Sequence, residues 1–202
     1  MFKKILFICC LVAGMLSGMN VFAQDTPEKQ REAVDNQMTG IRNFNSTVNE
    51  AISANKLYTH RLTLNSADAG AKIWGGLSKY QENINFYFDL RDGLPVLKKV
   101  IVLSEIASRQ AYTDFLYDEQ GNASLCMYQY NVANTTDAAS RYYYYNKRLI
   151  HVAKGTIEDT QYLYETDFGT QDLQSGIEMI ARAESFRKIF DSLVRVQAPA
   201  TK

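Results

Sequence analysis

The stretch INFYFDLRDGLPVLKKVIVLSEI, residues 84–106, decides the fold that the sequence predicts. Apolar side chains occupy every second position from Ile84 to Leu90, which is the period of an extended strand with one apolar face. The tripeptide Arg91-Asp92-Gly93 then has turn composition, and residues 97–106 are rich in β-branched and apolar residues. The stretch therefore predicts an antiparallel β-hairpin.

Two further hairpins follow the same pattern. One has strands at residues 112–117 and 124–132, and the other at residues 142–145 and 149–153, each pair separated by polar turn residues. Phe88, Tyr117 and Tyr145 are spaced by 29 and 28 residues. A degenerate hairpin repeat and a plain meander with strands of similar length explain this spacing equally well. Both interpretations predict the same antiparallel sheet.

Helical periodicity flanks the hairpins. Apolar residues recur at spacings of three and four from Pro27 to about Ser53 and again over residues 170–194. Residues 58–64 predict one more strand, whereas residues 161–165 fit a strand or a helical turn. We therefore expect an α+β fold, an antiparallel β-meander of five to seven strands with an N-terminal and a C-terminal helix packed on one face.

Residues 1–23 have the layout of a bacterial secretory signal peptide. Lys3 and Lys4 form a positive segment, an apolar run extends from Ile5 to Met15, and Val21-Phe22-Ala23 ends in a small residue. The apolar run is shorter than the roughly 18 residues that a spanning helix needs. We expect a periplasmic or secreted protein with no stable membrane insertion after signal cleavage. Residues 24–197 then form a single domain, and residues 198–202 a disordered tail.

Composition narrows the function classes. Loss of Lys3 and Lys4 with the signal peptide leaves 20 basic and 22 acidic residues, a net charge of −2, which argues against a nucleic-acid partner. Cys126 is then the one remaining cysteine, so no internal disulfide can form. Its place in an apolar strand predicts a small buried residue, and a catalytic thiol is the alternative.

Three segments resemble the tyrosine-rich hairpins of uncharacterised secreted α+β proteins of bacteria, as found in Bacteroidetes. They are residues 85–89 (NFYFD), residues 113–121 (TDFLYDEQG) and residues 141–150 (RYYYYNKRLI). In those proteins a Tyr-Tyr-Phe-Asp run is followed by a Gly-Lys-Leu-Ile return strand. Here the third hairpin lacks the turn glycine, and the second has Asn-Ala-Ser in place of Gly-Lys-Leu. The resemblance covers about half of the chain and implies an exported protein but no activity.

Catalytic and metal-binding patterns are missing from the sequence. It has no Gly-x-Ser-x-Gly motif and no glycine-rich phosphate loop, and His60 and His151 are its two histidines. Two distant histidines and one cysteine do not make a zinc site, and no Asp-rich calcium loop is present. We therefore expect no enzyme activity, no cofactor and no metal. Carboxylate pairs for glycoside hydrolysis stay open, because their separation depends on the fold.

Tyrosine is the one enriched residue type that suggests a binding surface. Ten of the thirteen tyrosines lie between Tyr112 and Tyr164. If both helices cover one sheet face, the other face displays a ladder of tyrosines, which offer large contact area at little entropy loss. The expected binding residues are Tyr87, Tyr128, Tyr130, Tyr143 and Tyr145.

The function that follows is a non-catalytic binding or interaction protein whose partner is an envelope protein, a peptide or a glycan. One alternative is a carrier for a small lipid or glycan, with a pocket between the helices and the sheet. Another is a purely structural envelope module, in which the tyrosines only pack across strands.

Overall fold

The computed structural model describes residues 26–64, 80–106, 109–130, 139–156 and 159–197. The predicted signal peptide and the predicted tail lie outside the described residues. The chain divides into two compact units, residues 1–32 and residues 33–202. The contacts that define the fold lie within the second unit.

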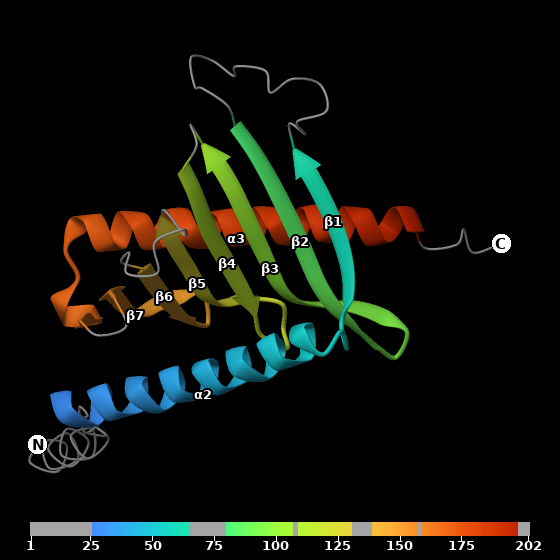
Figure 1. The fold of residues 1–202 in the computed structure, drawn as a ribbon. Helices are drawn as coiled ribbons and strands as arrows, with labels where there is room; N and C mark the ends of the chain where they lie inside the picture. The colour runs from blue at the N-terminus through green and yellow to red at the C-terminus, as the bar shows by residue number, and fades with distance from the viewer. Residues whose placement is uncertain (1–25, 65–79, 107–108, 131–138, 157–158, 198–202) are drawn as a thin grey trace, which may run out of the picture. The chain divides into compact units, whose positions relative to one another are not determined.

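The fold is α+β, as predicted, with two long helices and one antiparallel sheet (Figure 1). The elements are α2 (Pro27–Ser53), β1 (Tyr58–Leu64), β2 (Tyr80–Arg91), β3 (Leu94–Ile106), β4 (Arg109–Tyr117), β5 (Ala123–Tyr130), β6 (Ala139–Tyr145), β7 (Arg148–Gly155), β8 (Thr160–Tyr164), the 3-10 turn η2 (Glu165–Asp167) and α3 (Thr170–Gln197). The eight strands pair in the order of the chain, so each contacts its sequence neighbours. The sequence predicted five to seven strands, and the additional strand is β8, which settles the open alternative at residues 161–165.

The three predicted hairpins share one irregularity. The pairing register shifts shortly before each turn, between Tyr87 and Phe88, between Leu116 and Tyr117, and between Tyr143 and Tyr144. A bulge of this kind increases the local twist and redirects the side chains that follow it. The three shifts recur every two strands, which supports the interpretation of the hairpins as a degenerate repeat.

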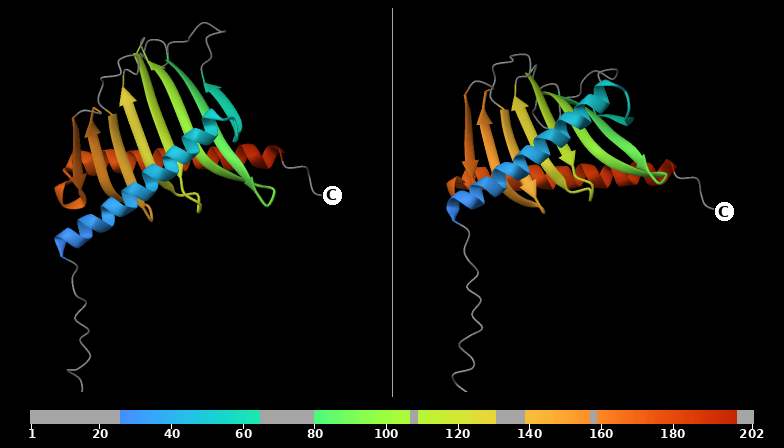
Figure 2. Two further views of the ribbon diagram at one scale, coloured as in Figure 1. Left: turned by 60° about the horizontal axis from the view of Figure 1, so that its bottom comes forward. Right: turned by 90° about the horizontal axis from the view of Figure 1, so that it is seen from below.

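The two helices pack against opposite faces of the sheet, as both views of Figure 2 show. Phe115 of β4 belongs to the cluster that contains Ala183 of α3, whereas its neighbour Leu116 belongs to the cluster that contains Met38 of α2. The prediction that both helices pack on one face was therefore wrong. The physical reason is that β4, β5 and β6 have apolar residues at successive positions, so both of their faces need cover.

On the α3 face, the aromatic residue after each register shift contacts the helix. The pairs are Phe88 with Phe190 (ring centroids 5.3 Å apart), the Tyr117 hydroxyl with the Ala183 carbonyl oxygen (2.7 Å) and the Tyr144 hydroxyl with the Gly176 carbonyl oxygen (2.7 Å). The helix partners are seven residues apart, which is about 10.5 Å along the axis. The sheet partners lie on alternate strands, about 9.6 Å apart. The period of α3 therefore matches the period of the hairpins.

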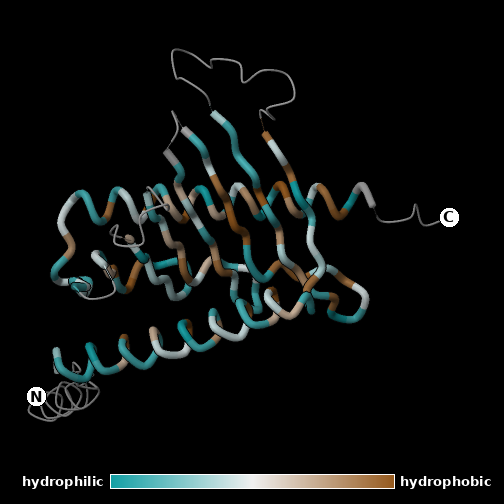
Figure 3. Tube along the Cα trace, viewed as in Figure 1, coloured by the Kyte–Doolittle hydropathy of each residue, from teal (hydrophilic) through white to brown (hydrophobic). Residues whose placement is uncertain are grey.

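On the other face, α2 packs through an apolar stripe that includes Val34, Met38 and Val48, and long polar side chains add hydrogen bonds to the sheet. The Tyr164 hydroxyl donates to Asp35 (2.8 Å), Arg42 Nε donates to the Tyr143 hydroxyl (3.2 Å), and Lys99 Nζ donates to the Oδ1 atoms of Asn45 and Asn49 (2.8 Å each). Only Met38 and Val48 of this helix are buried apolar residues. Much of the α2 trace is accordingly hydrophilic in Figure 3.

Candidate functional site

A groove lies between α2 and the turns that join β4 to β5 and β6 to β7. We call it the turn groove. It is lined by Gln37, Gly40, Ile41, Asp118, Gln120, Ser124, Tyr144, Tyr145 and Asn146, and its volume is about 450 Å³. Pockets for small molecules in proteins measure roughly 300–1,000 Å³. The turn groove is therefore large enough for one small ligand.

The β4–β5 turn forms one wall of the groove and is organised by Asp118. Its Oδ1 atom accepts the backbone N–H of Gln120 (2.9 Å) and of Asn122 (2.8 Å), a common arrangement for an aspartate that opens a turn. Gly121 has a φ of 77°, which a residue without a Cβ adopts at no steric cost. The carboxylate is thus held in one orientation by main-chain donors.

The β6–β7 turn forms a second wall. Its central residues Asn146 and Lys147 have φ values of 49° and 65°, the conformation of the tight hairpin turn that glycine usually serves. Asparagine tolerates this region well, so Asn146 serves the first central position of the turn without a glycine. Tyr145, which precedes the turn, is 52% exposed. The turn therefore presents an aromatic ring and a carboxamide next to each other.

Gly40 of α2 borders the groove and has no packing reason to be glycine. A Cβ placed on it would meet no atom within 4 Å. Glycine inside a helix costs about 1 kcal/mol relative to alanine. The helix thus has a residue of low helix propensity at the position where its surface faces the groove.

The lining of the turn groove contains one carboxylate and no cationic side chain. Three cations near its turns, Arg187 of α3 together with Lys147 and Arg148, bond to other groups, and the partner of Arg148 is Glu165. Arg187 Nη1 donates to the Gly121 carbonyl oxygen (2.9 Å), and Lys147 lies 3.7 Å from Glu184. The groove therefore offers hydrogen-bonding groups without a positive charge for an anion.

The five predicted binding tyrosines do not form one surface. Tyr145 lines the turn groove, while Tyr143 is 2% exposed beneath α2. Tyr87 is half-buried and pairs in register with Lys99 on the α2 side. Tyr128 and Tyr130 lie on the opposite face, where they are 38% and 39% exposed. A tyrosine ladder on one open face required both helices to lie on the other, which they do not.

Tyr128 and Tyr130 flank an ordered polar cluster beside α3. Glu82 is 9% exposed, and its Oε1 atom accepts hydrogen bonds from Ser104 (2.9 Å) and Arg182 (3.3 Å). Burial and the adjacent Glu82 carboxylate raise the pKa of Tyr80 to about 12. Two predicted tyrosines and an arginine that stacks on Phe115 and Phe186 thus share one exposed patch, which we call the Tyr128 patch.

A buried ion pair lies between α2 and the sheet. Lys99 is completely buried, and its Nζ atom is 2.7 Å from Asp114 Oδ2 in addition to its bonds to Asn45 and Asn49. Three acceptors satisfy the three N–H groups of the lysine, which is what a buried charge requires. Sequence reasoning missed this pair. The available signal was a lysine inside an apolar strand together with two asparagines four residues apart on one helix face.

His151 lies nearby in an aromatic cage. It is completely buried, neither ring nitrogen has a hydrogen-bond partner among the described residues, and its ring lies 5.0 Å from that of Tyr164 and 5.7 Å from those of Tyr143 and Tyr162. Burial lowers the pKa of His151 to about 4, and the charge of Arg42 acts in the same direction. The imidazole is therefore neutral at physiological pH, and it is inaccessible to a substrate.

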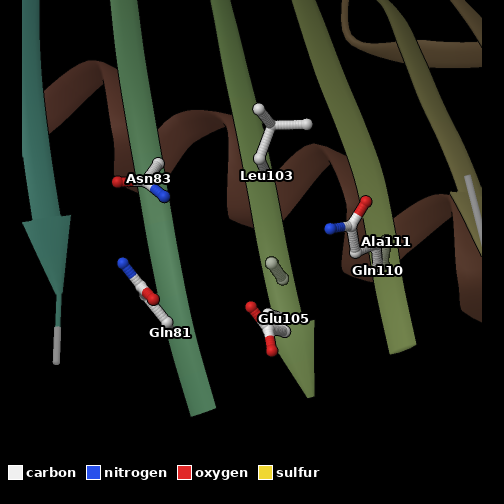
Figure 4. Close-up of a pocket in the computed structure, with 7 residues that line it drawn as sticks. Gln81, Asn83, Leu103, Glu105, Gln110 and Ala111 are labelled. Atoms are coloured by element: carbon white, nitrogen blue, oxygen red, sulfur yellow. The ribbon is translucent and has the colours of Figure 1, made fainter. Parts of the chain in front are cut away.

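A smaller hollow of about 150 Å³ lies on the part of β2, β3 and β4 that α2 leaves uncovered (Figure 4). Figure 4 shows the side chains of Gln81 and Asn83 opposite those of Glu105 and Gln110, with Leu103 between the strands. Asn83 accepts a hydrogen bond from Thr63 (3.0 Å). This hollow is polar but holds only a few atoms.

Cys126 is completely buried on the α3 face, which confirms the prediction of a small buried residue. Burial raises the pKa of its thiol well above the ordinary value. The thiol therefore stays protonated and is a poor nucleophile.

Two searches over the described part of the chain found nothing. No group of three or more His, Cys, Asp and Glu side chains there could hold a metal ion. No described helix is long and apolar enough to cross a membrane. Comparison with protein-family models, with curated proteins and with solved structures gave no match.

Proposed function

We propose that this protein is an exported, non-catalytic binding protein that holds a small ligand in the turn groove. Export follows from the signal-peptide layout of residues 1–23. The predicted alternative was a carrier with its pocket between the helices and the sheet, and the proposal keeps the carrier but moves the site to the groove between α2 and two turns. The observation on which the proposal depends is Gly40, a helix-weakening residue that faces open space in the wall of the groove.

The lining of the groove supports a binding role. Small-ligand sites combine apolar contact area with a few well-positioned polar groups. Tyr145 and Ile41 supply apolar surface, and Asp118 supplies a carboxylate fixed by two main-chain hydrogen bonds.

A substitution that fills the groove tests the proposal. Gly40→Phe places a ring in the open space, and Gly40→Ala is the matched control because it adds one methyl group to the same position. We expect the protein and its Gly40→Ala variant to retain a small compound from a low-molecular-weight extract of the source cells, as read by mass spectrometry after gel filtration. The Gly40→Phe variant should retain none, while its circular dichroism and Tm stay close to those of Gly40→Ala. Equal retention by both variants, or by neither, contradicts the proposal.

A second candidate function is contact with an envelope protein through the Tyr128 patch. The observation in its favour is that two exposed tyrosines, Tyr128 and Tyr130, are neighbours and that Arg182 lies near Tyr128, since tyrosine and arginine are enriched at binding hot spots. A crosslinked partner that is lost in Tyr130→Ala but kept in Tyr145→Ala supports this function. The reverse pattern assigns the partner to the turn groove.

A further inference from the structure

We infer that the ligand of the turn groove is a neutral saccharide. This inference rests on the proposed function and adds the chemical class of the ligand. It excludes the lipid that the carrier alternative also allows.

Charge is the first argument. The lining residues include Asp118 and no lysine, arginine or histidine, so a phosphate or carboxylate ligand would find no counter-charge. Arg187, Lys147 and Arg148 lie near the turns but are bonded to Gly121, Glu184 and Glu165. A fatty acid or a phospholipid headgroup is disfavoured for this reason.

Hydrogen-bonding capacity is the second argument. Gln37, Gln120 and Asn146 contribute carboxamides, each of which can donate and accept. A sugar hydroxyl also donates and accepts, so it can pair with any of these groups. Asp118 accepts two main-chain N–H groups at Oδ1 and a long hydrogen bond from Asn122 Nδ2 at Oδ2 (3.5 Å), and a carboxylate oxygen can accept a second donor beside such a bond.

Tyr145 provides the third argument. Its side chain is half exposed in a groove that otherwise has only Ile41 as a large aliphatic residue. An aromatic ring beside several carboxamides can contact the C–H face of a pyranose while the rim hydroxyls pair with the amides. A long acyl chain needs a continuous apolar lining instead.

The experiment is an NMR titration of the ¹⁵N-labelled protein with five probes. Cellobiose, maltose and N,N′-diacetylchitobiose are neutral, glucuronate is an acidic sugar, and laurate is a lipid. We expect at least one neutral disaccharide to shift the amides of Gln37, Gln120 and Asn146, with about a tenfold loss of affinity in Tyr145→Ala. Tyr130→Ala, an exposed tyrosine on the opposite face, is the control and should leave the affinity unchanged.

One variant isolates the role of charge. Asparagine can still accept the two main-chain hydrogen bonds of the turn, so Asp118→Asn keeps the groove and removes its negative charge. We expect glucuronate to bind only in this variant, because the repulsion between its carboxylate and that of Asp118 is then removed.

The outcomes separate the inference from the proposed function. The saccharide is overturned, and the binding function is left intact, if the neutral sugars cause no shifts of the groove amides while another probe does. That probe is laurate, or glucuronate with the unaltered protein. Sugar-induced shifts that persist in Tyr145→Ala and Gly40→Phe place the sugar elsewhere and overturn both. Absence of shifts with every neutral sugar also overturns the saccharide, and the retention of a compound by Gly40→Ala then decides the binding function separately.

Discussion

The two faces of the sheet both pack an apolar cluster against a helix, but they differ in its size and in the polar contacts beside it. Against α3, aromatic rings pack on one another and tyrosine hydroxyls bond to main-chain carbonyls of the helix. Against α2, a smaller apolar cluster around Met38, Val48 and Leu125 is supplemented by an ion pair, carboxamides and tyrosine hydroxyls at the ends of long side chains. Close packing of apolar groups contributes most of a fold's stability, whereas buried polar contacts mainly select one arrangement. We interpret the α3 face as the larger apolar core and the α2 face as a smaller core whose arrangement also depends on polar contacts and which borders the turn groove.

The glycines of the two helices also differ in how closely the sheet approaches them. A Cβ on Gly176 of α3 would lie 2.8 Å from Leu149 Cδ2, whereas a Cβ on Gly40 of α2 would meet nothing. The first glycine permits close approach of helix and sheet, and the second leaves room. The predictions below test this difference between the faces.

Phe190→Ala should have the largest effect. Phe190 is 2% exposed and contacts Phe86, Phe88 and His60 through ring distances of 5.3–6.4 Å. Removal of the ring creates a cavity in the α3 face, and we expect unfolding free energy to fall by about 4 kcal/mol. Urea denaturation measures this loss. A loss below about 1 kcal/mol would show that α3 is not part of the stabilising core.

Lys99→Met should have the second-largest effect, lowering the unfolding free energy by about 3 kcal/mol. The substitution keeps an unbranched side chain but leaves Asp114 buried with no counter-charge. The double variant Lys99→Met/Asp114→Leu should recover most of the loss, because it removes both charges. If the single and double variants are equally unstable, shape rather than charge is what the α2 face requires.

The unfolding free energy should fall at acid pH, because His151 beneath α2 becomes protonated. The folded pKa of about 4 is below the value near 6.5 of an unfolded histidine. Stability from the neutral ring is therefore complete above pH 6.5 and is lost as pH falls toward 4, by up to about 3 kcal/mol. Thermal melts between pH 7 and pH 4 measure the slope, and His151→Gln should make it shallower. An unchanged slope in that variant would assign the acid sensitivity to other groups.

The two glycines should respond to alanine in opposite directions, with the smallest effects. Gly40→Ala should stabilise the protein by about 0.5–1 kcal/mol, because helix propensity improves and nothing clashes. Gly176→Ala should destabilise it by about 1 kcal/mol, because the contact with Leu149 outweighs the gain in propensity. Chemical denaturation of both variants in parallel gives the comparison. The same sign for both would remove the distinction between a close-packed face and an open one.

Both helices and all strands except β8 could be predicted, because each depends on local patterns. Alternation from Ile84 to Leu90 specifies a strand wherever it lies in the fold, and three-to-four spacing specifies the helices. The hairpin turns are equally local, since Asp118 and Gly121 act within five residues of each other.

The tertiary structure alone decided which face each helix covers and where a groove forms. In β4, Phe115 and Leu116 are both apolar, and alternation cannot say which of two apolar faces meets α2 or α3. The pairing of Lys99 with Asp114, Asn45 and Asn49 likewise joins positions up to 69 residues apart. Tyr145 is exposed and Tyr143 is buried although both are tyrosines of β6. Their burial is set by the elements that pack on them and not by the residue type.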